Sequence, residues 1–87
     1  MVHQIESALR SALDIHYIKI IDNSHKHAGH KQNINGGHYE AHIVSNDFEH
    51  KSLINRHRMI YKILDDMMKT KIHALSIKAQ TVKEFNF

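Results

Sequence analysis

The 87-residue sequence contains no cysteine and no proline. Without cysteine, no disulfide can support the fold, and no thiolate of this chain can bind a metal. Apolar residues nowhere continue for the ~18 positions that a membrane-spanning helix needs, and residues 1–6 lack the basic segment and apolar run of a cleaved signal. We therefore expect one small soluble domain over residues 1–87, in a bacterial-type cytoplasm and with no membrane part.

The formal net charge is +3, and the ten histidines are not counted in it. Because histidine titrates near pH 6.5, the positive charge should rise steeply on mild acidification. Lysine and arginine are scattered along the chain, so the charge pattern is compatible with nucleic-acid binding but does not require it. The composition predicts a weak attraction to anionic partners and nothing more specific.

Hydrophobic periodicity predicts the element order α-β-β-α-β, with a single turn before the second helix and a short helix at the end. The elements are a helix over 2–13, strands over 15–21 and 38–45, a helix over 52–69, a strand over 72–79 and a helical turn over 81–85. Ser52 and Thr81 are the expected N-caps of the last two helices. The apolar stripe of the helix over 52–69 is formed by Leu53, His57, Ile60, Leu64 and Met67.

The connections between the strands predict a three-stranded mixed sheet in an α+β fold. Strands 38–45 and 72–79 are joined by a helix and should be parallel, whereas strands 15–21 and 38–45 are joined by a loop and should be antiparallel. The end of the first strand and the starts of the other two then meet at one edge. This arrangement is expected to bring His27, His38 and His73 into one neighbourhood.

Several histidines are candidates for a site. His73 opens the last strand on its apolar side, where a histidine facing inward is more often a packed core residue than a ligand. His57 lies on the helical stripe and is expected to be structural. The loop over 22–37 is rich in Asn, Gly, His and Lys, and a loop of this length is uncommon unless it is functional or mobile.

Five segments resemble the BolA family, in the family's order and across residues 2–81. The resemblance is carried by 55–61 (NRHRMIY) and 72–75 (IHAL), and upstream by 22–30 (DNSHKHAGH), 36–39 (GGHY) and 43–48 (IVSNDF). It implies a small KH-like domain. His50 stands where the family commonly has glycine, which leaves the conformation of that turn open.

The resemblance implies a non-enzymatic partner of a monothiol glutaredoxin that shares a [2Fe–2S] cluster with it for cluster delivery or iron sensing. The BolA side supplies a histidine at the position matched by His73 and a second ligand from the loop. His27 matches that loop ligand best, with His25 and His30 as competitors. The thiolates would come from glutaredoxin and glutathione, so we expect a monomer that binds no cluster alone and a heterodimer that does.

Other residues support this site or surround it. His38 is either a supporting residue that orients His73 or a strand end without a role. Arg56 and Arg58 flank His57 and are expected to project from the helix. With Lys51 and Lys62 they would form a basic edge that meets an acidic partner, a glutathione carboxylate or nucleic acid, or they simply form a solvated helix face.

Three other functions remain open. BolA relatives have been described as transcriptional regulators, so DNA is a second candidate partner, although the chain lacks the basic Gly-x-x-Gly loop of KH modules and has few aromatic residues. An enzyme is not expected, because no nucleophile motif is present and carboxylates cluster only at Asp65 and Asp66. The loop histidines could also chelate zinc or nickel adventitiously.

Overall fold

The computed structural model describes residues 1–24 and 37–87. The elements are α1 (Val2–Ala12), β1 (Ile15–Asp22), β2 (Gly37–Ser45), the 3₁₀ turn η2 (Asn46–Phe48), α2 (Leu53–Ile63), α3 (Asp65–Thr70), β3 (Ile72–Gln80) and α4 (Val82–Phe85). The predicted order is confirmed, including the turn before α2 and the short terminal helix. None of the helices in the described part is long and apolar enough to cross a membrane.

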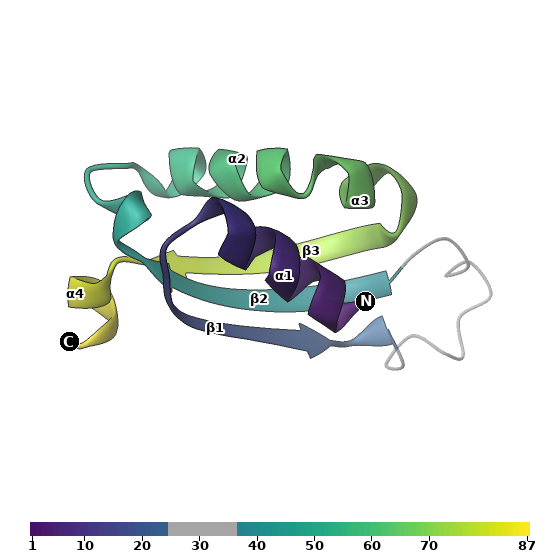
Figure 1. Cartoon of the computed structure of the whole chain (residues 1–87), viewed down its shortest axis with the longest axis horizontal. Coiled ribbons are helices and arrows are strands. Elements are labelled where there is room, and N and C mark those ends of the chain that lie inside the picture. Colours follow the sequence, from purple (N-terminus) through teal and green to yellow (C-terminus); the bar gives the residue numbers. More distant parts are fainter. Residues whose placement is uncertain (25–36) are drawn as a thin grey trace.

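The strands form one sheet in the order β1-β2-β3. β1 pairs with β2 in the antiparallel sense and β2 pairs with β3 in the parallel sense, as the connections predict. Helices α1, α2 and α3 all lie on the same side of this sheet, and α4 lies at the end where β3 finishes (Figure 1). The opposite face of the sheet is therefore left without a helical layer over most of its length.

The core lies between the sheet and the three helices. Alternate residues of β2 point into it, so that Tyr39, Ala41 and Ile43 are buried while Glu40 between them is exposed. The helices contribute the side chains that cover these strands. They are Ile5 and Leu9 of α1, Ile60 of α2 and Leu64 at the junction of α2 and α3, with Phe48 of η2 beside them.

The predicted helix over 52–69 is instead two helices that meet at Leu64. The backbone of Leu64 has φ −95° and ψ 15°, outside the usual helical region. Helix α3 starts immediately after it, with Asp65 and Asp66 in its first turn. Carboxylates at this position interact favourably with the positive end of the helix dipole, which supports a new helix start here.

The buried stripe of α2 differs from the predicted one. Arg56 is only 6% exposed and shares the stripe with Ile60 and Leu64, whereas Leu53 is 64% exposed. His57 is half-buried at the side of the stripe. The prediction that Arg56 projects from the helix toward a partner is therefore wrong.

The Arg56 guanidinium connects three separate parts of the fold. Its Nε donates to the Lys51 carbonyl at 3.0 Å, and its Nη1 donates to the Ala79 carbonyl at 3.0 Å. Nη1 and Nη2 also donate to the two carboxylate oxygens of Glu84, at 2.7 and 3.1 Å. The start of α2, the end of β3 and helix α4 are thus held by one side chain.

Glu84 also takes part in the capping box at the N-terminus of α4, where Thr81 is the N-cap residue. Its Oε1 accepts the Thr81 N–H at 2.9 Å, while the Thr81 hydroxyl accepts the Glu84 N–H at 3.2 Å, which completes a capping box. The hydrogen bond from Arg56, followed by that from Thr81, lowers the pKa of the Glu84 carboxyl from its usual 4.5 to about 2. The ionised carboxylate is therefore the form that the folded protein favours.

The first prediction concerns this carboxylate. Glu84→Gln should lower the melting temperature at pH 7, because the buried guanidinium loses its counter-charge. The folded-state pKa lies below the unfolded one, so the stabilisation from ionised Glu84 is complete above pH 4.5 and is lost as the pH falls to about 2. Thermal unfolding from pH 7 to pH 2 should show the two proteins converging in acid. Glu49→Gln, an equal charge change at an exposed residue, should show no such convergence.

The second prediction concerns His50, whose φ of 63° places it in the left-handed region. A residue with a Cβ is strained there by about 1–2 kcal/mol relative to the ordinary helical region, and glycine is not. His50→Gly should therefore stabilise the fold by about 1 kcal/mol in urea unfolding, after the extra chain entropy of glycine is subtracted. His50→Ala removes the same imidazole but keeps the Cβ. Equal effects of the two substitutions would contradict backbone strain as the cause.

Candidate functional site

The end of β1 and the starts of β2 and β3 meet at one end of the sheet. The Asn23 N–H donates to the His38 carbonyl at 2.7 Å, and the Gly37 N–H donates to the Lys71 carbonyl at 3.0 Å. The Ser24 hydroxyl accepts the His38 N–H at 3.0 Å. These contacts produce the shared edge that the topology predicts (Figure 1).

Two of the predicted histidines lie in contact at this edge. The ring centroids of His38 and His73 are 5.0 Å apart, and the ring planes are inclined by 40°. Two imidazoles that bind one metal ion at about 2.0 Å have their ring centroids roughly 5 Å apart, so the separation suits joint ligation as well as a supporting role for His38. His25, His27 and His30 lie outside the described residues, so the choice of loop ligand stays a prediction.

His73 is exposed, and the expectation that it faces inward is wrong. The cause is a shift in the pairing of β2 with β3, where Gly37 is opposite Ile72 but His38 is opposite Ala74. His73 is thus the additional residue of a bulge, which interrupts the alternation of faces. Ile72 occupies the buried position instead, with 4% of its surface exposed.

Gly37 and Tyr39 support the start of β2 and were not identified as site residues from the sequence. A Cβ on Gly37 would lie 2.5 Å from Cε2 of Tyr39, so only glycine fits without displacing the ring. Burial, and then the negative charge of Asp22, raise the pKa of the Tyr39 phenol, against a hydrogen bond with Ser24 that lowers it. The neutral ring therefore packs beside the backbone that carries His38. The sequence signal for this contact is the segment 36–39 (GGHY).

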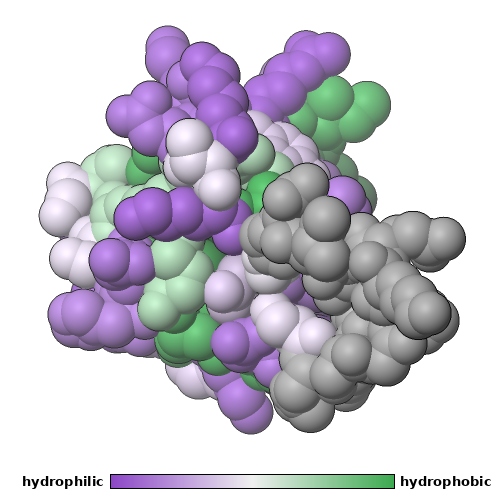
Figure 2. All heavy atoms as spheres, turned by 90° about the vertical axis from the view of Figure 1, so that its right-hand side faces the viewer, coloured by the Kyte–Doolittle hydropathy of each residue, from purple (hydrophilic) through white to green (hydrophobic). Residues whose placement is uncertain are grey.

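The donor groups at this edge suit a metal group that is shared with another molecule. The whole chain has no cysteine, and the described residues contain no cluster of three or more His, Cys, Asp or Glu side chains able to hold a metal. His38 and His73 supply two imidazoles at this edge. The end of the molecule seen in Figure 2 combines hydrophilic and hydrophobic residues. Two donors leave the remaining coordination positions to the loop or to a partner.

The four basic residues predicted to contact a partner, which lie on α2 or just before it, divide into two groups. Lys51, Arg58 and Lys62 line one shallow groove of about 390 Å³, together with His50, Asn55 and Met59. Arg58 is exposed, and its Nη1 lies 3.4 Å from Oδ1 of Asn55. Arg56 is not part of this groove, because it is buried against Ala79 and Glu84. Three of the four predicted contact residues therefore share a surface that can receive an anionic partner.

Comparison with known proteins shows the family and the fold. Residues 9–84 match a protein-family model described as BolA-like protein. The chain is 34% identical over 85 residues to the DNA-binding transcriptional regulator BolA of Escherichia coli K12, covering 94% of this chain and 76% of that protein. It is 40% identical to SufE-like protein 1 of Arabidopsis thaliana, covering 93% of this chain but only 24% of that longer protein. The solved BolA domain of SufE1 from Arabidopsis thaliana has a TM-score of 0.84 and 41% identity, with coverage of 95% and 93%.

Proposed function

Because this chain belongs to the BolA family, we propose that it is a non-enzymatic partner of a monothiol glutaredoxin. In the complex it shares a [2Fe–2S] cluster, which it helps to deliver or uses to sense iron. His73 is the ligand from β3, His27 is the ligand from the loop and His38 supports His73. The protein is a monomer when alone and works in the cytoplasm.

The observation that carries this proposal is the contact of the exposed His73 with the half-buried His38. A ligand that binds a cluster together with a second protein has to reach beyond its own surface. The bulge gives His73 that exposure, and the contact with His38 limits the directions in which its ring can turn. An inward-facing His73 could not meet a partner without unfolding the start of β3.

The absence of cysteine determines how such a cluster would be held. Imidazole ligands in place of two thiolates raise the reduction potential of a [2Fe–2S] centre. The protein has no thiolate of its own, so the cysteine of glutaredoxin and a glutathione would supply the thiolates. Because protonated imidazole does not bind metal, the shared cluster should be released by mild acid more readily than one held by four thiolates.

The groove of Lys51, Arg58 and Lys62 supports an anionic partner surface. Arginine can form paired hydrogen bonds with a carboxylate, as in an acidic face of glutaredoxin or in glutathione. The same groove favours the second candidate function, a nucleic-acid-binding regulator like the Escherichia coli relative. The two candidate functions differ in how binding depends on salt. Affinity for nucleic acid should fall steeply as the salt concentration rises, because several phosphates are contacted.

The third prediction tests His73. The protein is mixed with a monothiol glutaredoxin that carries a glutathione-ligated [2Fe–2S] cluster, and visible absorption and circular dichroism are followed. One-to-one association should change the spectrum, and His73→Ala should abolish that change while leaving the fold intact. His3→Ala removes an exposed imidazole from α1 and should behave like the unchanged protein.

An unchanged spectrum with His73→Ala, compared with the wild-type complex, would refute His73 as a ligand. If no complex forms at all, the glutaredoxin assignment fails and the nucleic-acid regulator becomes the better proposal. A salt-dependent affinity for DNA that decreases with Arg58→Ala would then support the groove on α2 as the binding surface.

The fourth prediction ranks the loop histidines. His27→Ala should perturb the visible circular dichroism of the heterodimer cluster more than His25→Ala or His30→Ala, since His27 matches the family's loop ligand best. The three variants differ only in the position of the missing imidazole, so each is a control for the others. Equal effects would remove the basis for choosing His27.

A further inference from the structure

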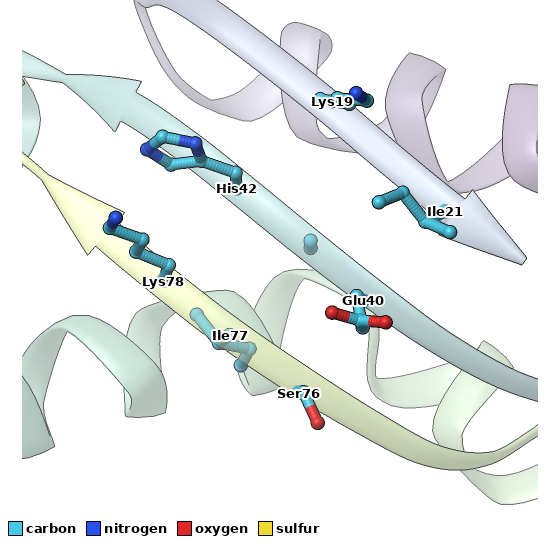
Figure 3. A pocket seen from close by; sticks show the side chains of 8 residues that line it. Lys19, Ile21, Glu40, His42, Ser76, Ile77 and Lys78 are labelled. Atoms are coloured by element: carbon cyan, nitrogen blue, oxygen red, sulfur yellow. The ribbon is translucent and has the colours of Figure 1, made fainter. Parts of the chain in front are cut away.

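The face of the sheet opposite the helices contains a hollow of about 270 Å³. Ile21, which is 41% exposed, contributes its open apolar part and Ser76 contributes a hydroxyl, whereas Ala41 and Ile77 belong to the core side of the sheet and only line its floor. Lys19, His42 and Lys78 extend over it from three adjacent strands (Figure 3). Nothing in the cluster-binding edge or in the groove of α2 uses this face.

Lys19, His42 and Lys78 form a row straight across the sheet. Lys19 is directly opposite His42, and His42 is directly opposite Lys78. Neighbouring strands are about 4.8 Å apart, so two ammonium groups and an imidazole are concentrated within roughly 10 Å. The row therefore places two positive charges on one face of the sheet, with the His42 imidazole between them.

No ion pair of the described residues includes this row. Neither Lys19 nor Lys78 takes part in those ion pairs, which join Arg10 to Glu6, Arg56 to Glu84 and Lys69 to Asp65. Glu40 is the only carboxylate among the residues that line the hollow, and its Oε2 accepts a hydrogen bond from the neutral Nδ2 of Asn23. Its single negative charge offsets one of the two lysines, so the hollow keeps an excess of positive charge for an external anion.

The imidazole of His42 is held in place between them. Its Nε2 lies 2.7 Å from Oε1 of Gln80, and its ring meets the rings of Tyr17 and Phe85 edge-on at 5.3 and 5.6 Å. Nδ1 is the ring nitrogen that this contact with Gln80 leaves uninvolved. These contacts fix the position of the His42 ring between the side chains of Lys19 and Lys78.

We propose that this face binds a phosphorylated sugar, free or as part of a mononucleotide. The phosphate carries nearly two negative charges and several acceptor oxygens, which match the ammonium groups of Lys19 and Lys78. Glu40 and Ser76 lie one row further along, where they can bind sugar hydroxyls. The exposed side chain of Ile21 then contacts the carbon face of the ligand. This site is independent of the cluster-binding proposal.

The fifth prediction is tested by nuclear magnetic resonance on the 15N-labelled protein at low salt. Ribose 5-phosphate and adenosine monophosphate should cause saturable amide shifts confined to the hollow and its row, and adenosine should not. Lys19→Met/Lys78→Met should weaken binding about ten-fold or more, since each charged contact is worth about 1.5–3 kcal/mol. Comparing the two ligands shows whether the base adds affinity to the sugar phosphate.

Lys69→Met/Lys71→Met is the matched control, because it removes the same charge from exposed residues at the end of α3. It should leave the affinity within two-fold of wild type, an allowance of about 0.4 kcal/mol. The proposal would be overturned if the amide shifts were spread over α2, or if adenosine bound as tightly as adenosine monophosphate. It would also be overturned if the control double variant lost as much affinity as Lys19→Met/Lys78→Met. Tight binding of a single-stranded oligonucleotide to this face with no binding of either small phosphate would overturn it too, because this face would then be a nucleic-acid surface.

Discussion

The contact between Arg56 and Glu84 is the interaction on which most of the architecture depends. A buried guanidinium is costly unless it is paired, and here it is paired with a carboxylate and two main-chain carbonyls. Glu84 in turn caps α4, and α4 places Phe85 in a stack on Tyr17 with ring centroids 5.0 Å apart. One charge in the helical layer therefore influences the position of aromatic side chains on the opposite face of the sheet.

The sequence predicts the order and topology of the elements because both depend on local signals. Alternation over 38–45 identifies a half-buried strand, and a helical crossover requires parallel neighbours. Thr81 was also identified from the sequence as the N-cap of the last helix. Arg56 was misjudged because an arginine on a helix is usually exposed. Its burial follows from Ala79 and Glu84, whose proximity appears only once the chain is folded.

The orientation of His73 shows why site geometry is harder to predict than topology. Strict alternation from Leu75 backward places His73 on the buried face. The bulge opposite Gly37 and His38 shifts this alternation by one residue, and it depends on the pairing of two strands rather than on β3 alone. A position that would have been a core residue is thereby converted into an accessible one. Sequence could identify His73 and His38 as neighbours but not their exposure.

The Arg56–Glu84 contact is also resistant to acid. The hydrogen bond from Arg56, followed by that from Thr81, holds the pKa of the Glu84 carboxyl at about 2, so the carboxylate stays ionised well below neutral pH. The proposed shared cluster would be more sensitive to acid, because protons compete with metal for imidazole nitrogen. Under the proposed function, release of the cluster by mild acid and loss of the fold are therefore separate events, which a transfer protein requires if it is to be reloaded.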